Sequence, residues 1–308
     1  MTIIFFGSDP WFSQPVLTAL LEAGHEVAIV VTKQKNIVNR QSLIVNREED
    51  ISVSSLRGAF IGSRLSVSDI PDAIVLAAFG PPFLPAEVLS WPKYGCLNVH
   101  ASLLPRWRGA SPVFGAIANG DEETGVSIMK MTEEIDLGPV LGQERTVLSG
   151  RGPSSLENRE SLTRRLGSLG GELIVETLRK LENGEIEEIK QPVESPTPYT
   201  HRLTKDSGRV DWTKPAEEIE RFIRAVTPWP GAWTEVKFEI LNLSRGAGSG
   251  SAGKFEIKEI KILKAHLEDP LASTINHQPL TIDLVQLPGK NPISWKAFLA
   301  GHPGAKLN

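Results

Sequence analysis

The feature that most constrains the fold is the first 32 residues, which read as a strand, a helix and a second strand. Residues 2–7 (TIIFFG) and 25–32 (HEVAIVVT) are almost entirely apolar, as strands buried on both faces of a sheet are. Between them, residues 11–24 have helical apolar spacing and end on Gly24, a residue that helices favour at their carboxyl end. Such a β-α-β unit predicts an open, mostly parallel, Rossmann-like α/β sheet.

The turn after the first strand argues against one common class of Rossmann-like protein. It reads Gly7-Ser8-Asp9-Pro10 and lacks the G-x-G-x-x-G run that binds the pyrophosphate of a dinucleotide. Nicotinamide chemistry is therefore not expected. Residues 33–50 have no clear periodicity and are expected to begin as a loop that runs into a part whose structure the sequence does not assign. Further strands of the sheet are predicted at residues 72–80, 94–102 and 124–131, and helices at residues 110–120 and 153–184.

The composition and the apolar pattern of the sequence change from about residue 191 onward. Residues 191–202 (QPVESPTPYTHR) contain three prolines within seven residues, which is typical of an extended linker. After them, a short helix is predicted at 216–226, followed by short strands at residues 231–238, 256–265 and 280–286. Several short strands indicate a small β-barrel or sandwich. We therefore expect a first domain at 1–190, a linker at 191–204 and a smaller β-domain at 205–308.

Composition limits the class of protein further. The net charge of −4 over 308 residues argues against a protein that coats nucleic acid. Cys96 is the only cysteine, so no intrachain disulfide can form, and we expect a small buried residue in a cytoplasmic protein. The amino-terminal segment has no basic region followed by a long apolar run, so neither a targeting segment nor a membrane span is expected.

The candidate chemistry lies at the end of the strand predicted at 94–102. Asn98 and His100 are two residues apart, so they project from the same face of that strand. They lie at its carboxyl end, where open α/β sheets bind their ligands. An amide donor beside an imidazole could stabilise a carbonyl oxygen that gains negative charge during acyl transfer. The alternative is that both side chains satisfy backbone groups of a loop.

Longer segments around this pair resemble the folate-dependent formyltransferases. The similarity lies in GCLNVHASLLPRWRGASP at 95–112, ETGVSIMKMTEEIDLGPVL at 123–141 and LAAFGPPFLP at 76–85. It implies a formyltransferase fold and a metal-free reaction catalysed by Asn98, His100 and Asp136. It also implies folate contacts from the SLLP turn and the pterin-pocket segment, at Ser102, Leu103, Leu104, Pro105, Phe79 and Gly80. Because loops after parallel strands emerge at one edge of a sheet, we expect Asp136 to reach the Asn98 strand there.

The carboxyl-terminal third resembles the members of that family that act on methionyl-tRNA. Residues 202–236 and 280–302 carry this similarity. It implies transfer of the formyl group of 10-formyltetrahydrofolate to the methionine of initiator methionyl-tRNA, for translation initiation. It further implies that residues 205–308 are an OB-like tRNA-binding barrel, and that Arg40 and Arg47 contact tRNA. Leu137 and Pro139 depart from the family pattern around Asp136, and the segment 33–70 is shorter than the family's basic loop.

Other functions remain open from the sequence. A sugar-nucleotide N-formyltransferase or a formyltetrahydrofolate hydrolase would carry the same three catalytic residues. A non-catalytic folate-binding or RNA-binding module would not need them. Arg106 and Arg108, on either side of Trp107, could face the glutamate tail of folate or a phosphate, or could be solvated arginines of a turn anchored by Trp107.

Overall fold

The computed structural model describes residues 1–32, 43–46, 56, 70–78, 84–148, 157–240, 254–267, 280–302 and 305–307. The chain forms two compact units. The first comprises Met1–Ala116, Asp121–Leu148 and Glu160–Arg202, and the second comprises Ile117–Gly120, Ser149–Arg159 and Leu203–Asn308. The expected division into domains at 1–190 and 205–308, with a linker at 191–204, stays a prediction about independent domains.

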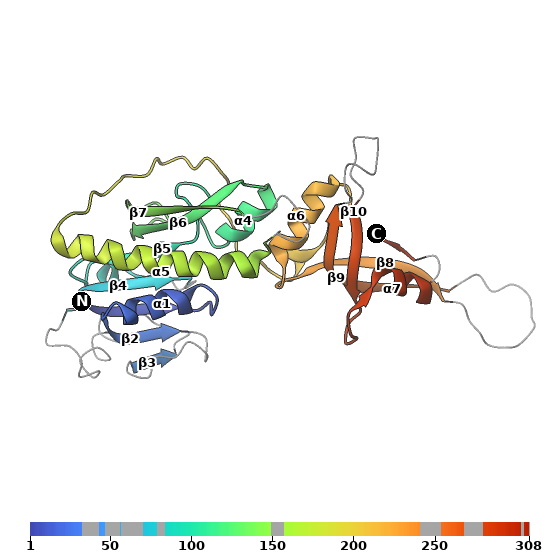
Figure 1. The fold of residues 1–308 in the computed structure, drawn as a ribbon, viewed down its shortest axis with the longest axis horizontal. Helices are drawn as coiled ribbons and strands as arrows, with labels where there is room; N and C mark the ends of the chain where they lie inside the picture. Colours follow the sequence, from blue (N-terminus) through green and yellow to red (C-terminus); the bar gives the residue numbers. More distant parts are fainter. Residues whose placement is uncertain are drawn as a thin grey trace, which may run out of the picture. The chain divides into compact units, whose positions relative to one another are not determined.

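The first unit is built on a seven-stranded sheet (Figure 1). Its strand order is β3-β2-β1-β4-β5-β6-β7. The strands are β1 (Thr2–Gly7), β2 (Glu26–Thr32), β3 (Leu43–Asn46), β4 (Ala73–Ala77), β5 (Cys96–His100), β6 (Glu123–Lys130) and β7 (Val140–Val147). The pairings from β3 through β5 are parallel, whereas β5–β6 and β6–β7 are antiparallel. The predicted open, mostly parallel α/β sheet is confirmed.

Helices cover this sheet and supply part of its core. They are α1 (Ser13–Glu22), α3 (Ala86–Leu89), α4 (Pro112–Asn119) and α5 (Arg159–Asn183). The long helix α5, yellow-green in Figure 1, runs along the sheet and buries Leu162, Leu166 and Leu178 at helical spacing. Gly167 lets the helix approach closely, because a Cβ there would stand 2.9 Å from the Trp11 carbonyl oxygen. At Gly170 a Cβ would stand 2.7 Å from Cγ1 of Val99, so α5 also packs directly against β5.

Part of the segment expected to be a loop is a strand. Residues 43–46 form β3, which pairs in parallel with β2 in the register Ile29 to Leu43. The expectation for 33–50 was a loop that runs into a part of unassigned structure, and it contained no strand, so it missed these four residues. Three apolar residues in a strand this short cannot establish a periodicity, so the pattern was too brief to predict it.

The second unit contains a five-stranded antiparallel sheet of order β11-β10-β9-β8-β12. Its elements are a 3₁₀ turn (Asp206–Gly208), α6 (Ala216–Val226), β8 (Ala232–Ile240), β9 (Lys254–Leu267), β10 (Leu280–Gln286), β11 (Ile293–Ser294), α7 (Trp295–Gly301) and β12 (Lys306–Leu307). The helix predicted at 216–226 and the three predicted strands are confirmed. Helix α6 buries Ile219 and Ile223, because its apolar residues recur at helical spacing. In the part of the chain that the structure describes, no helix is both long and apolar enough to cross a membrane.

Candidate functional site

Strand β5 positions the first two candidate residues. It lies between β4 and β6, and four of its five residues are buried, so its backbone is fixed on both sides. The exception is Asn98, which is half-buried and opposite Met129 of β6. Within the described residues its side-chain amide makes no hydrogen bond. An amide that is accessible and has no protein partner there is available to a ligand.

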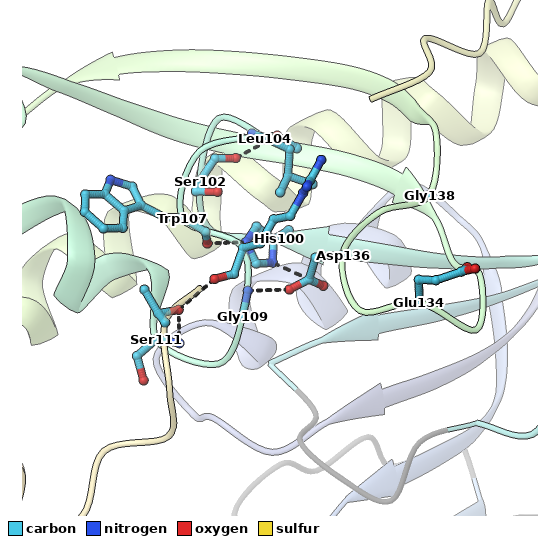
Figure 2. A network of polar contacts seen from close by, with 12 residues as sticks. His100, Ser102, Leu104, Trp107, Gly109, Ser111, Glu134, Asp136 and Gly138 are labelled. Carbon is cyan, nitrogen blue, oxygen red and sulfur yellow. Dashed lines mark hydrogen bonds and ion pairs between the residues drawn. The ribbon is translucent and has the colours of Figure 1, made fainter. Parts of the chain in front are cut away.

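His100, at the carboxyl end of β5, is held in one orientation. Its side chain is only 6% exposed, and its Nε2 lies 3.1 Å from the carbonyl oxygen of Trp107 (Figure 2). Because a carbonyl can only accept, this contact places a proton on Nε2. In the neutral ring Nδ1 is then unprotonated, and it lies 3.9 Å from Oδ1 of Asp136. The free ring nitrogen therefore faces the carboxylate.

Asp136 reaches His100 by a route that differs from the expected one. Strand β6 runs antiparallel to β5, with Lys130 opposite Leu97, so the loop after β6 starts at the amino end of β5. The expectation that this loop emerges beside the carboxyl end of β5 is wrong, because the sheet is antiparallel at this point. The loop folds back instead. Lys130 N–H donates to the Pro139 carbonyl at 2.9 Å, and a Cβ at Gly138 would collide with the Lys130 carbonyl oxygen.

Asp136 itself is held in an unusual backbone conformation. Its φ of 52° lies in the left-handed region that residues with a side chain rarely adopt. The carboxylate is 13% exposed, and its Oδ2 accepts a hydrogen bond of 2.6 Å from the Gly109 N–H. Figure 2 shows one dashed contact from the carboxylate to the His100 ring and a second to the Gly109 amide. The structure thus brings His100 and Asp136 together, with Asn98 on the same strand as His100.

The SLLP turn is fixed largely by a serine that the sequence analysis missed. Ser127, on β6 opposite His100, donates to the Ser102 carbonyl at 2.6 Å and accepts from Leu104 N–H at 3.0 Å. Ser102 and Leu104 are consequently buried, whereas Leu103 and Pro105 are half-buried. The signal for Ser127 was present: it is a polar residue inside an otherwise apolar strand.

Some of the residues predicted to contact folate or tRNA fall in segments that the structure does not describe. Phe79, Gly80, Arg40 and Arg47 lie outside the described residues. The folate contacts of Ser102, Leu103, Leu104 and Pro105 also stay predictions.

Both arginines of the turn donate hydrogen bonds to other residues of the protein, although the Arg106 side chain is 38% exposed. Arg106 donates to Asp121 at 2.9 and 2.5 Å, and the Trp107 indole N–H donates to the same carboxylate at 2.6 Å. The Arg108 side chain is completely buried, and its guanidinium donates to Gln191 Oε1 and to two backbone carbonyls. Of the two alternatives that the sequence left open, the structure supports a turn anchored by Trp107. The expectation that both arginines of this turn are solvated is wrong for Arg108, because its guanidinium finds its acceptors inside the protein. Arg108 does not face a ligand.

A second group of residues that sequence reasoning missed comes from the segment 191–200. Thr197 Oγ1 accepts from Trp107 N–H at 2.8 Å, and Ser195 Oγ donates to the Pro105 carbonyl at 2.9 Å. Thr200 pairs with the turn through its backbone as well. These contacts join residues about 90 positions apart, and no local pattern could have indicated them. The segment expected to be an extended linker therefore packs against the turn that follows β5.

One further side chain, that of Cys96, lies at the start of β5. Burial raises the pKa of the Cys96 thiol to about 12, as expected for a small buried residue without an activating partner. Among the residues that the structure describes, no three His, Cys, Asp or Glu side chains are grouped so that they could bind a metal ion.

Comparisons with known proteins agree with this architecture. Residues 1–178 match the family described as formyl transferase, and residues 202–303 match the formyl transferase C-terminal domain. A methionyl-tRNA formyltransferase from Gluconobacter oxydans is 38% identical over 99% of this chain and 98% of its own length. One from Ruegeria pomeroyi is 37% identical over 99% of both chains.

Solved structures show the same fold. A methionyl-tRNA formyltransferase from Clostridium thermocellum superimposes with a TM-score of 0.56 and 16% identity, covering 93% of this chain and 98% of its own. HypX from Aquifex aeolicus, solved in complex with tetrahydrofolic acid, gives a TM-score of 0.61 at 19% identity, covering 96% of this chain and 46% of its own. The family match over more than half of the chain and the near full-length relatives lead to one conclusion: the chain belongs to the formyl transferase family, among the methionyl-tRNA formyltransferases.

Proposed function

We propose that this chain transfers the formyl group of 10-formyltetrahydrofolate to the amino group of methionine on initiator methionyl-tRNA. One observation carries the proposal: the Nδ1 of a fixed, buried His100 faces the Asp136 carboxylate, on the strand that also presents the half-exposed Asn98 amide. These are the groups that an acyl transfer to an amine requires, namely oxyanion donors and a proton acceptor. The identity of the acceptor is supported by relatives of that name matching over the whole chain.

The reaction assigns a separate task to each of the three side chains. The folate supplies an activated formyl carbon. The neutral amine adds to this carbon to give a tetrahedral adduct, and the carbon–N10 bond breaks when the oxygen re-forms its double bond to carbon. Asn98 donates its amide N–H to the formyl oxygen as that oxygen gains negative charge. His100 can donate from Nδ1 only in its protonated form, since Nε2 already donates to the Trp107 carbonyl.

Asp136 takes up the proton that the attacking amine loses, directly or through a water molecule. Its Oδ2 is occupied by the Gly109 N–H, so Oδ1, on the side of the His100 ring, is the oxygen free for this role. The proton then becomes available to N10 of the departing tetrahydrofolate. No step in this sequence needs a metal ion.

The described residues fit a folate donor at this edge of the sheet. Leu103 and Pro105 are half-buried and present apolar surface, while the backbone of the turn beneath them is fixed through Ser127. Contacts from Ser102, Leu104, Phe79 and Gly80 belong to the same proposal. For tRNA, we assign the region 205–308 and the basic residues Arg40 and Arg47.

A comparison of acceptors tests the proposal. The purified protein is mixed with 10-formyltetrahydrofolate carrying a labelled formyl group and, in parallel, with initiator methionyl-tRNA, a 4-amino-4-deoxy sugar nucleotide, or buffer alone. We expect label in methionyl-tRNA at a rate at least a hundredfold above the other two. Faster transfer to the sugar nucleotide would favour a sugar N-formyltransferase, and faster release of formate would favour a hydrolase. Either result overturns the proposed acceptor.

A further inference from the structure

We propose that Gln191 sets the position of Asp136 relative to His100, and that it is a positioning residue for formyl transfer. The residue precedes the proline-rich part of the segment 191–200 and is 55 residues away from Asp136 in sequence. Its catalytic consequence rests on the function proposed above. Its structural consequence, the position of the Asp136 carboxylate, does not.

The Gln191 amide connects the Asp136 loop to Arg108 in the turn after β5. Its Nε2 donates to the carbonyl oxygens of Asp136 and Gly138, at 3.0 and 2.7 Å. Its Oε1 accepts from Nε and Nη2 of Arg108, at 3.2 and 2.9 Å. Both amide hydrogens and both oxygen lone pairs are therefore used. The opposite orientation would place oxygen against two carbonyls and NH₂ against a guanidinium, so the assignment of the amide is unambiguous.

Arg108 fixes Gln191 in this position. The guanidinium is fully buried, and within the described residues its acceptors are uncharged oxygens of Gln191, Pro192, Val193 and Tyr199. A buried cation without a carboxylate partner must keep every one of these acceptors, because losing one leaves an unsatisfied donor. Arg108 lies in the turn that also carries Trp107, whose carbonyl orients His100. Gln191 is thus fixed to the His100 side of the site.

Asp136 depends on such external contacts because its backbone is strained. At a φ of 52° it occupies the left-handed region, which a non-glycine residue leaves when surrounding contacts do not maintain it. Two hydrogen bonds hold Asp136 in place. Its carboxylate accepts from the Gly109 N–H of the turn, and its backbone carbonyl accepts from Gln191, which also bonds the turn through Arg108. Removing the second contact frees the backbone that carries the carboxylate. The distance of 3.9 Å between His100 and Asp136 would then no longer be maintained.

The variant Gln191→Glu separates this role from simple packing. It preserves shape, keeps an oxygen towards Arg108 and adds a counter-charge for that guanidinium. It also replaces the amide donor by an oxygen that faces the two carbonyls of the Asp136 loop. A purely structural role through Arg108 predicts a variant as active as wild type. The positioning role predicts lost activity in a folded protein.

Four measurements on one preparation decide between these roles. Hydrogen exchange of the Gly109 amide, followed by NMR on protein labelled with ¹⁵N-glycine, reports the contact with Asp136 without any substrate. The thermal midpoint and the affinity for tetrahydrofolate report folding and binding. The single-turnover rate of formyl transfer reports chemistry. The matched control is Gln14→Glu, because the Gln14 amide is at the surface of α1 and, among the residues that the structure describes, bonds only Thr18 at 3.5 Å.

For Gln191→Glu we expect Gly109 to exchange at least tenfold faster and transfer to slow at least tenfold. The thermal midpoint and tetrahydrofolate affinity of this variant should match those of wild type. The control Gln14→Glu should match wild type in all four measurements. Unchanged Gly109 exchange, or unchanged transfer despite faster exchange, overturns the proposal. A rate that falls only in proportion to the folded fraction also overturns it. If the glutamate variant does not fold, Gln191→Met removes the donor without adding charge and is judged by the same outcomes.

The same experiments distinguish a failure of this inference from a failure of the proposed function. If wild type transfers no formyl group to methionyl-tRNA, the proposed function fails. The Gly109 exchange rate still shows whether Gln191 positions the Asp136 carboxylate.

Discussion

At the scale of single residues, the chemistry depends on which nitrogen of His100 is already engaged. The Trp107 carbonyl accepts from Nε2, so only Nδ1 can act on a substrate or on Asp136. Trp107 adopts a φ of 56°, and its indole N–H donates to Asp121. The sequence predicted His100 and Asp136 through their resemblance to a known family. It could not predict this tautomer, because the carbonyl that selects it carries no side-chain signal.

Replacing the imidazole tests its role directly. We expect His100→Ala to retain its fold but to lose nearly all formyl transfer, because the ring serves the transition state. Since the ring is 6% exposed and hydrogen-bonded, a stability loss of about 1–3 kcal/mol should accompany the change. Urea unfolding gives the stability, and single-turnover kinetics at full saturation give the rate. A variant that keeps more than about a tenth of the wild-type rate would contradict the oxyanion role.

At the scale of elements, the site consists of β5, the turn that follows it, and two segments that pack on this turn: the Asp136 loop and segment 191–200. The strand β5, the helix α4 and most other elements were predictable, because their apolar residues recur with a period of two or 3.6. The strand β3 was not, since four residues establish no period. The path of the Asp136 loop was predicted wrongly, because the switch from parallel to antiparallel pairing at β6 depends on contacts across the sheet. The packing of the segment 191–200 on the turn likewise has no local signature.

The contact between the turn and segment 191–200 makes Gly109 a sensitive position. Gly109 has a φ of 102°, and a Cβ there would collide with the Thr200 carbonyl oxygen. Gly24 has a φ of 80° but nothing within 4 Å of such a Cβ, so it is a matched control for backbone strain alone. We expect Gly24→Ala to lower the free energy of unfolding by about 1–2 kcal/mol. Gly109→Ala should lower it by about 2 kcal/mol more, because the added methyl group separates segment 191–200 from the turn.

Chemical denaturation in urea measures both variants under the same conditions. The Gly109 variant should also transfer the formyl group more slowly, because its N–H donates to Asp136. Equal stability losses for the two variants would show that segment 191–200 does not restrain the turn.

At the scale of the whole molecule, the proposed function requires both folate binding and recognition of tRNA, a polyanion. The net charge of −4 means that contacts with tRNA must come from local groups of basic residues. We expect the affinity for initiator tRNA to fall steeply with added salt, because each phosphate contact releases counterions.

Changing two basic residues tests which positions make these contacts. Arg40→Ala combined with Arg47→Ala should reduce the slope of log affinity against log salt by about one to two, as expected for two lost phosphate contacts. Binding is measured by fluorescence titration between 50 and about 300 mM salt. An affinity that does not respond to salt would remove tRNA from the account and favour a small sugar acceptor.

The most direct test of the central claim is the behaviour of Asp136→Asn. Asparagine has almost the same shape, and its amide oxygen can still accept from the Gly109 N–H, so the loop should keep its structure. It cannot take up the proton of the attacking amine. We predict a single-turnover rate of formyl transfer that is lower by roughly a hundredfold or more, with wild-type thermal midpoint and tetrahydrofolate affinity. A rate that falls only in step with lost stability would show that Asp136 merely maintains the turn before Gly138, and would contradict the proposed catalysis.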